Sequence, residues 1–246
     1  VSPLTIGTDT GDSIRKPAAY NGVIGVKPTY GRISRYGIIP YASSLDHVGY
    51  FTTTIQDAAK ALRVLAGRDD RDMTSSYEPV PDYEALLDQD IKGKRIAIID
   101  NVQEAIQDKA IVESFNDLTQ KLEQRGAQIE HVRLNDDLLS VLLPTYFIIA
   151  NAEATANHSN LDGIRYGVRE DGDSVEEVMI NSRTKGFSAN IRKRFVIGSY
   201  SLFVENQDKL FRKAQKVRRL IVNEVKAVLD QYDIILTTAA PTIRGR

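Results

Sequence analysis

The sequence predicts an α/β fold in which a central mixed β-sheet is flanked by helices. Short apolar runs with strand character are separated along the chain by amphipathic helical patterns. One strand–helix–strand unit in the middle of the chain favours a parallel, right-handed crossover. With 246 residues, of which 42% are hydrophobic and 26% charged, the chain can bury a core and has an ordinary globular composition.

The first third of the chain is rich in turn residues. Glycines and prolines separate its short elements. We expect strands at 4–8 and 50–53, and a short helix or turn at 13–22 that leads to residues 23–26. The next element is a helix from Thr54 to Ala66. Thr54 can cap it, because Asp57 follows three positions later, and Gly67 ends it.

The middle and end of the chain predict further alternation. Residues 95–100 have the pattern of a buried strand, and residues 128–134 form the next strand. The helix between them ends at Gly126 and has one apolar face, made of Ile111, Phe115, Leu118 and Leu122. A helix-rich stretch covers about 138–232, and a last buried strand follows at 232–237.

Composition excludes several kinds of site. The chain has no cysteine, which rules out disulfides, thiolate catalysis and cysteine metal ligands. Its three histidines lack ligand spacing, so we expect no metal site. A net charge of −1 gives no reason to expect a nucleic-acid or membrane surface. No apolar run approaches the roughly 20 residues that span a bilayer, and no signal peptide opens the sequence, so we expect a cytoplasmic protein.

Ser13 is the strongest candidate for a functional residue. It follows a run of small residues and precedes a predicted helix start, in the sequence Gly7-Thr8-Asp9-Thr10-Gly11-Asp12-Ser13-Ile14-Arg15-Lys16-Pro17-Ala18-Ala19. Three interpretations fit the tripeptide around it. Ser13 could cap a helix; the turn could cradle a phosphate, although the lysine of a Walker loop is missing; or Ser13 could be a nucleophile beside backbone N–H groups.

Residues 6–49 as a block resemble the amidase signature family. Besides the Ser13 run, the block contains Gly22-Val23-Ile24-Gly25-Val26-Lys27-Pro28-Thr29-Tyr30-Gly31-Arg32 and Ser43-Ser44-Leu45-Asp46-His47-Val48-Gly49. Later motifs resemble one branch of this family, the A subunits of glutamyl-tRNA(Gln) amidotransferases. These motifs are Ala152-Glu153-Ala154, Asp162-Gly163-Ile164-Arg165-Tyr166-Gly167 and Gln215-Lys216-Val217-Arg218-Arg219-Leu220-Ile221.

The resemblance implies one amidase-signature domain over residues 1–246, truncated at both ends, with a Ser–Ser–Lys mechanism. Ser13 matches the nucleophile that forms an acyl-enzyme with glutamine and releases ammonia. The backbone N–H groups of Thr10, Gly11 and Asp12, with that of Ser13, match the oxyanion hole. The lysine base and the bridging serine belong to segments that precede Val1. We therefore expect this chain alone to be inactive as an amidase.

Two further residues match substrate-binding positions of this branch. Arg194, the last residue of a basic triplet, corresponds to the arginine that holds the α-carboxylate of glutamine, a group that the planar guanidinium binds with two parallel hydrogen bonds. Tyr146 would line the glutamine pocket. From the residues alone, a solvated helix face for Arg194 and core packing for Tyr146 remain alternatives. The acidic residue that binds the substrate amino group would lie beyond Arg246.

Asp12 departs from the family pattern, which usually has glycine at this position. A carboxylate beside a developing oxyanion is unfavourable, and a Cβ can strain a turn that prefers glycine. Aspartate tolerates left-handed backbone better than most residues do. Either the protein is impaired or Asp12 points away from the site.

The resemblance also implies partners, and two alternatives stay open. Ammonia would pass to partner B and C subunits in a heterotrimer, where Glu-tRNA(Gln) is amidated with ATP and Mg²⁺ bound by the partner and no cofactor in this chain. One alternative is a stand-alone amidase-signature hydrolase. The other is a non-catalytic scaffold subunit.

Two more features have unremarkable interpretations. Six basic residues at positions 209–219 could contact tRNA or a partner, but a solvated helix face is the default. His47 follows Asp46, which would suggest a Ser–His–Asp triad with Ser13, but the family resemblance gives His47 no such role.

Overall fold

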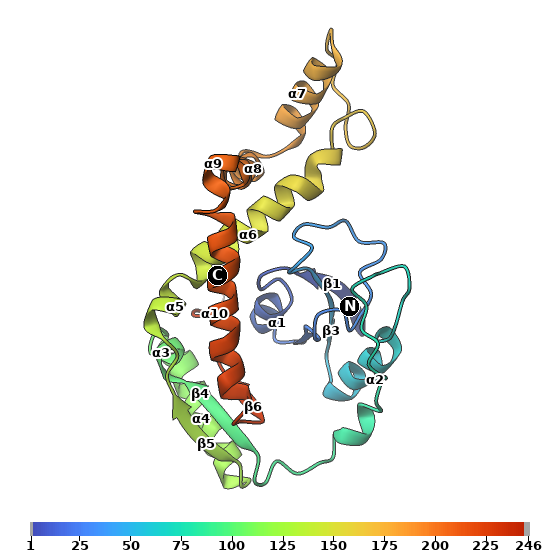
Figure 1. Cartoon of the computed structure of the whole chain (residues 1–246). Coiled ribbons are helices and arrows are strands. Elements are labelled where there is room, and N and C mark those ends of the chain that lie inside the picture. Colours follow the sequence, from blue (N-terminus) through green and yellow to red (C-terminus); the bar gives the residue numbers. More distant parts are fainter. Residues whose placement is uncertain (1, 244–246) are drawn as a thin grey trace. The chain divides into compact units, whose positions relative to one another are not determined.

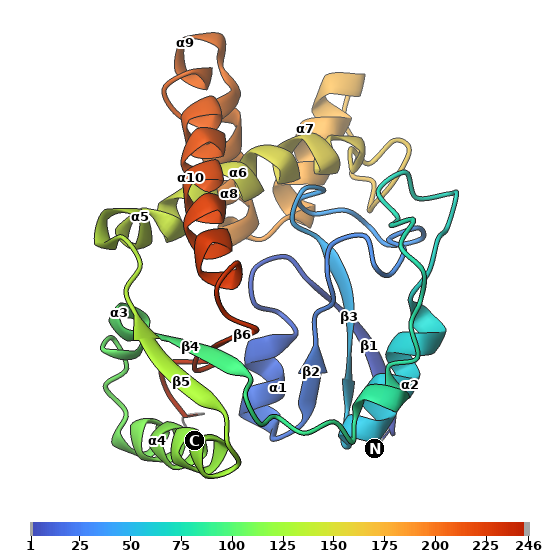
Figure 2. The same cartoon turned by 60° about the horizontal axis from the view of Figure 1, so that its bottom comes forward.

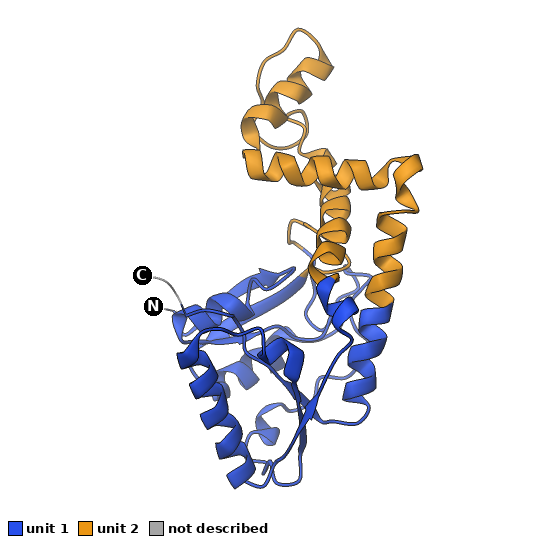
Figure 3. Cartoon of the chain, turned by 90° about the vertical axis from the view of Figure 1, so that its left-hand side faces the viewer, with its two compact units in different colours: residues 1–36, 47–140, 220–246 blue, residues 37–46, 141–219 orange. Residues whose placement is uncertain are grey.

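The structure is a computed structural model that describes residues 2–243, and it has the α/β architecture that the sequence predicts (Figure 1). Its contacts divide the chain into two compact units (Figure 3). Unit 1 holds residues 1–36, 47–140 and 220–246, and unit 2 holds residues 37–46 and 141–219. The predicted domain limits at Val1 and Arg246 fall outside the described residues, and the single-domain interpretation stays a prediction.

Unit 1 contains an antiparallel sheet with the strand order β1-β3-β2. Its strands are β1 (Leu4–Asp9), β2 (Ile24–Val26) and β3 (His47–Thr52). The short helix α1 (Arg15–Asn21) contacts β2, and α2 (Ile55–Leu65) contacts β2 and β3 (Figure 2). Strand β1 leads directly into the turn that carries Ser13, so this sheet fixes where that turn starts.

Strand β3 is longer than the sequence predicts, because it begins at His47 rather than at residue 50. All of β1 pairs with it, ending with Asp9 opposite His47. Gly7 lies opposite Gly49 in this register. Glycine is depleted in strands, so Gly49 hides the first half of β3 from a prediction based on side-chain pattern.

The predicted helix after β3 is confirmed, together with its cap. The backbone N–H of Asp57 donates to the Thr54 hydroxyl at 3.1 Å, as expected for an N-cap. Helix α2 ends at Leu65, and Gly67 two residues later has a φ of 141°. This φ is uncommon for residues with a Cβ, so the glycine suits the end of the helix.

Unit 1 also contains a parallel sheet with the strand order β5-β4-β6. Its strands are β4 (Arg95–Ile99), β5 (Gln128–Val132) and β6 (Ile234–Leu236). The β4–β5 pairing is parallel as predicted, and β6 also pairs with β4 in parallel. Helix α4 (Lys109–Gln124) joins β4 to β5, with the short α3 (Asp100–Gln103) before it. Strand β4 is the centre of this core, since Ile96, Ala97, Ile98 and Ile99 are all at most 3% exposed.

Unit 2 is helical among the described residues. Its most extensive helix packing is between α6 (Leu142–Asn157) and α8 (Ala189–Leu202). Gly198 of α8 makes this contact close, because a Cβ there would overlap the backbone oxygen of Asn151 and the hydroxyl of Thr155. The remaining helices of the chain are η1 (Glu84–Leu86), α5 (Asp136–Ser140), η2 (His158–Asn160), α7 (Val175–Gly186), α9 (Val204–Gln207) and α10 (Phe211–Leu229).

The helix-rich stretch is therefore confirmed, and α10 runs from unit 2 into unit 1. Among residues 2–243, no helix combines the length and the apolar character that crossing a bilayer requires.

Candidate functional site

Ser13 lies in the turn between β1 and α1, and its side chain is exposed. Its hydroxyl has no hydrogen-bond partner among the described residues. The next residue, Ile14, is completely buried. The buried Ile14 side chain therefore anchors the turn, and the neighbouring Ser13 hydroxyl is exposed on its surface.

The space for Ile14 is created by glycines on two neighbouring strands. A Cβ on Gly25 of β2 would lie 2.9 Å from the Ile14 carbonyl oxygen and 2.6 Å from the Ala18 Cβ. A Cβ on Gly49 of β3 would lie 2.9 Å from the Ile14 Cγ1. Contacts this short are strongly repulsive. The two glycines therefore allow Ile14, and with it the Ser13 turn, to lie close to β2 and β3.

Asp9 organises the turn by charge. It is 1% exposed, and its carboxylate accepts a hydrogen bond from the Ile14 backbone N–H at 3.0 Å. The same carboxylate accepts two bonds from the Arg15 guanidinium, both at 3.3 Å, and Arg15 also donates to the Gly11 carbonyl. A buried carboxylate needs such partners. Asp9 and Arg15 thus tie both ends of the Ser13 turn together.

Asp12 is exposed and forms an ion pair with Lys16, with 2.5 Å between the Lys16 Nζ and a carboxylate oxygen. The hydrogen bond and charge of Asp12 raise the pKa of Lys16. The φ of Asp12 is negative, as it is for every non-glycine residue that the structure describes. A Cβ at this position is therefore free of left-handed strain, and the carboxylate has its own counter-ion.

Thr10, Gly11 and Asp12 form the bend directly before Ser13. The Asp12 carbonyl accepts the Lys16 backbone N–H at 3.1 Å, which starts the first turn of α1. The role of the three N–H groups as an oxyanion hole stays a prediction. The three groups directly precede an exposed hydroxyl at a strand-to-helix turn.

His47 lies beside Lys27, with 3.4 Å between the His47 Nε2 and the Lys27 Nζ. Its ring also packs edge-on against Tyr30. Burial and the charge of Arg15 lower the pKa of Lys27, whereas Asp9 opposes this shift. These contacts place His47 among the side chains of the signature block.

Arg194 and Tyr146 both lie in unit 2, on α8 and α6. Arg192 and Lys193 are exposed, whereas Arg194 is half-buried and donates from its Nη1 to the Tyr41 hydroxyl at 3.0 Å. This hydrogen bond raises the pKa of Arg194, and the charges of the Tyr41 and Tyr146 phenols contribute. Of the basic triplet, Arg194 is the residue that the structure holds in place, and Tyr146 is near it.

Ser44, Glu153 and Arg218 form a cluster within unit 2 that sequence patterns did not indicate. The Glu153 carboxylate accepts the Ser44 backbone N–H at 2.8 Å and the Ser44 hydroxyl at 2.6 Å. Arg218 donates to the Ser44 hydroxyl at 2.9 Å and to its carbonyl at 3.0 Å. Three motifs that carry the family resemblance therefore meet at one serine. Arg218 is the inward-facing member of the basic run, whose other members are exposed.

The Asp162 motif forms a turn. Asp162 is 2% exposed, and it accepts the backbone N–H groups of Ile164 and Arg165 at 2.9 and 3.0 Å. These bonds, with the Arg165 guanidinium, lower the pKa of Asp162 to about 2. The motif is thus explained by local backbone geometry.

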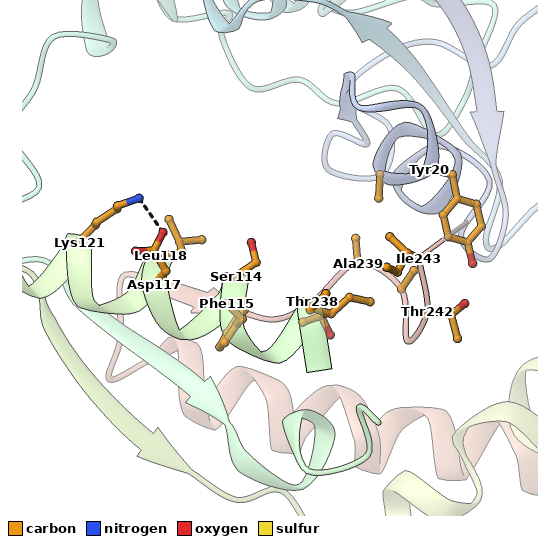
Figure 4. Close-up of a pocket in the computed structure, with 14 residues that line it drawn as sticks. Tyr20, Ser114, Phe115, Asp117, Leu118, Lys121, Thr238, Ala239, Thr242 and Ile243 are labelled. Carbon is orange, nitrogen blue, oxygen red and sulfur yellow. Dashed lines mark hydrogen bonds and ion pairs between the residues drawn. The ribbon is translucent and has the colours of Figure 1, made fainter. Parts of the chain in front are cut away.

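A cavity of about 640 Å³ in unit 1 does not include Ser13 among its lining residues. Figure 4 shows that one wall is made by α4, including Ser114, Phe115 and Leu118, and another by the segment after β6. Lys121 in this wall pairs with Asp117 at 2.6 Å. The described residues hold no group of three or more histidine, cysteine or acidic side chains that could bind a metal ion.

Several known proteins resemble the chain over nearly its whole length. The A subunit of the glutamyl-tRNA(Gln) amidotransferase of Lacticaseibacillus casei (strain BL23) is 42% identical over 239 residues, which are 97% of this chain and 49% of that protein. Its counterpart in Streptococcus gordonii (strain Challis) is 43% identical over 241 residues, 98% of this chain and 49% of that protein. The chain spans about half the length of the curated relatives it matches.

Solved structures of related proteins also match the chain over nearly its whole length. The crystal structure of the A subunit of the Thermotoga maritima glutamyl-tRNA(Gln) amidotransferase matches with a TM-score of 0.76 and 34% identity, covering 98% of this chain and 47% of that one. A bacterial aryl acylamidase of the amidase signature enzymes matches with a TM-score of 0.77 at 21% identity, covering 99% and 47%, which shows a shared fold. The family model described as Amidase matches residues 1–244, so the chain belongs to the amidase family.

Proposed function

We propose that the whole protein is the glutaminase component, the A subunit, of a cytoplasmic glutamyl-tRNA(Gln) amidotransferase. The observation that carries the proposal is an exposed Ser13 on a turn organised by Asp9, in a chain 42% identical to curated A subunits over 97% of its length. The two alternatives, a stand-alone hydrolase and a non-catalytic scaffold, are less favoured, because these relatives all carry the name of the amidotransferase.

The proposed chemistry begins at the Ser13 hydroxyl. Its oxygen attacks the side-chain amide carbon of glutamine, and the carbonyl oxygen becomes an oxyanion that the N–H groups of Thr10, Gly11, Asp12 and Ser13 would stabilise. The carbon–nitrogen bond then breaks and ammonia leaves with the proton from Ser13. Water hydrolyses the resulting ester to glutamate. Removal of one oxyanion-hole donor typically costs about 10²–10³ in turnover.

The proton transfer requires a base that this chain does not supply in the proposed mechanism. A lysine and a bridging serine from the rest of the whole protein would deprotonate Ser13, so this chain alone should not hydrolyse glutamine. Arg194 would bind the substrate α-carboxylate, and Tyr146 would line the same pocket. The ammonia would pass to partner B and C subunits, which would bind ATP, Mg²⁺ and Glu-tRNA(Gln).

The proposal is tested by ammonia release from glutamine, with the whole protein in its complex and with Ser13→Ala. We expect the variant to lose about 10⁶-fold in kcat, the scale seen when a serine nucleophile is removed. Ser159→Ala, an exposed serine of unit 2, is the matched control and should keep full activity. Equal ammonia release by the native protein and Ser13→Ala would contradict the proposal.

A further inference from the structure

Both the backbone and the ring of Tyr41 have fixed contacts. Its backbone N–H donates to the buried Asp46 carboxylate at 2.8 Å, and its carbonyl accepts the Asn157 side-chain amide at 3.0 Å. Its ring lies 5.7 Å from that of His158. The Tyr41 hydroxyl is therefore held at one place in unit 2 before any substrate arrives.

That hydroxyl joins two residues that are distant in the sequence. It donates to the Asn151 Oδ1 at 3.3 Å and accepts the Arg194 Nη1 at 3.0 Å. Asn151 is 1% exposed, and its backbone oxygen lies against Gly198 of α8. Its Nδ2 is buried and has no hydrogen-bond partner among the described residues.

This arrangement leaves most of the Arg194 guanidinium available. A guanidinium carries five N–H donors in a rigid plane, and Tyr41 occupies one of them. Bidentate binding of a carboxylate needs two parallel donors on one edge of that plane. A free arginine side chain samples many rotamers and loses that freedom when it binds. The Tyr41 hydroxyl, as a fixed acceptor for the Arg194 Nη1, orients the guanidinium plane before a carboxylate binds.

We propose that Tyr41 is a positioning residue: its hydroxyl, held by Asn151, orients the Arg194 guanidinium toward the α-carboxylate of an amino-acid amide substrate. This inference rests on the proposed function. It assigns Tyr41 a role in substrate specificity, since an amide without the α-carboxylate gains nothing from an oriented arginine.

The test is Tyr41→Phe in the whole protein in its complex, because phenylalanine keeps the ring and removes only the hydroxyl. Two substrates are compared, glutamine and 4-aminobutanamide, which is glutamine without its α-carboxylate. We expect KM for glutamine to rise about tenfold with kcat within about twofold, as for loss of one hydrogen bond to a charged group. kcat/KM for 4-aminobutanamide should stay within about twofold.

The matched control is Tyr200→Phe, which alters an exposed tyrosine on the same helix as Arg194. It should change kcat/KM for neither substrate. An unchanged KM for glutamine in Tyr41→Phe, or an equal loss on both substrates, would overturn the positioning role and leave the proposed function standing. Ammonia release that does not depend on Ser13 would instead overturn the proposed function, and this inference with it.

Discussion

At the scale of single residues, the Ser13 turn is organised by one buried charge and one buried apolar side chain. Asp9 bonds the Ile14 N–H and the Arg15 guanidinium, and Ile14 occupies space that Gly25 and Gly49 leave free. These residues of the signature block fix the turn. The hydroxyl that would react is the exposed one beside them.

Asp12 is the residue whose effect on catalysis is least obvious, and its pairing with Lys16 predicts that the effect is small. In the whole protein, Asp12→Gly should change kcat/KM for glutamine by less than about twofold. Lys16→Met leaves the carboxylate without its counter-ion close to a developing negative charge, so kcat should fall about fivefold.

The double variant Asp12→Gly with Lys16→Met completes this cycle and should recover native activity, because both charges are gone. Steady-state ammonia release measures all four proteins. Full activity in Lys16→Met alone would show that the Asp12 charge never reaches the oxyanion. A large gain in Asp12→Gly would support the interpretation of an impaired protein.

How much of the site the sequence predicts depends on the distance between partners along the chain. Ser13 stands out from one local motif, and Arg194 from a basic triplet in a matching position. Tyr41 could not be found in this way, because its hydrogen bond to Arg194 joins residues 153 positions apart. Local patterns carry no information about such pairs. All the predicted site roles stay predictions, namely those of Ser13, Arg194, Tyr146, Thr10, Gly11 and Asp12.

At the scale of elements, the close contact of α6 and α8 decides where Arg194 lies. Gly198 stands one helical turn from Arg194 and permits this contact. The local elements were predictable wherever a capping residue or an apolar run identified them, as for Thr54 before α2 and for β4. The start of β3 was not, because Gly49 is there to make room for Ile14 and has low strand propensity.

Gly198→Ala tests the α6–α8 contact. The new methyl group would overlap Asn151 and Thr155, so we expect a loss of about 1–3 kcal/mol in the free energy of unfolding. Gly186→Ala is the matched control: no atom lies within 4 Å of its Cβ position at the end of α7, and stability should hold or rise slightly. Urea denaturation compares the two. Equal midpoints would contradict the packing argument.

The Asp162 turn predicts a pH dependence at acidic pH. Its folded pKa of about 2 lies below the ordinary value of 3.8, so its carboxylate stabilises the fold above pH 3.8. That contribution is lost as pH falls from 3.8 through about 2. The thermal midpoint should therefore fall over this interval, and Asp162→Asn should show a smaller fall from a lower starting value. Parallel curves for the two proteins would refute the assignment.

At the scale of the whole molecule, the chain spans about half the length of its relatives and contains two compact units. Unit 1 carries the proposed nucleophile, and unit 2 carries the proposed carboxylate-binding arginine. The fold class followed from the alternation of strand and helix patterns. The division into units could not be predicted in this way. Residues 37–46 belong to unit 2 because of hydrogen bonds such as that of Ser44 to Glu153, and these two residues are far apart in the sequence.

The central claim is that Ser13 forms an ester with the glutamyl group of glutamine. The most direct measurement is acid quenching of the whole protein during turnover with isotopically labelled glutamine, followed by peptide mapping in a mass spectrometer. The account predicts a labelled glutamyl group on the peptide that contains Ser13, absent in Ser13→Ala. Ammonia release with the label on another residue would contradict it.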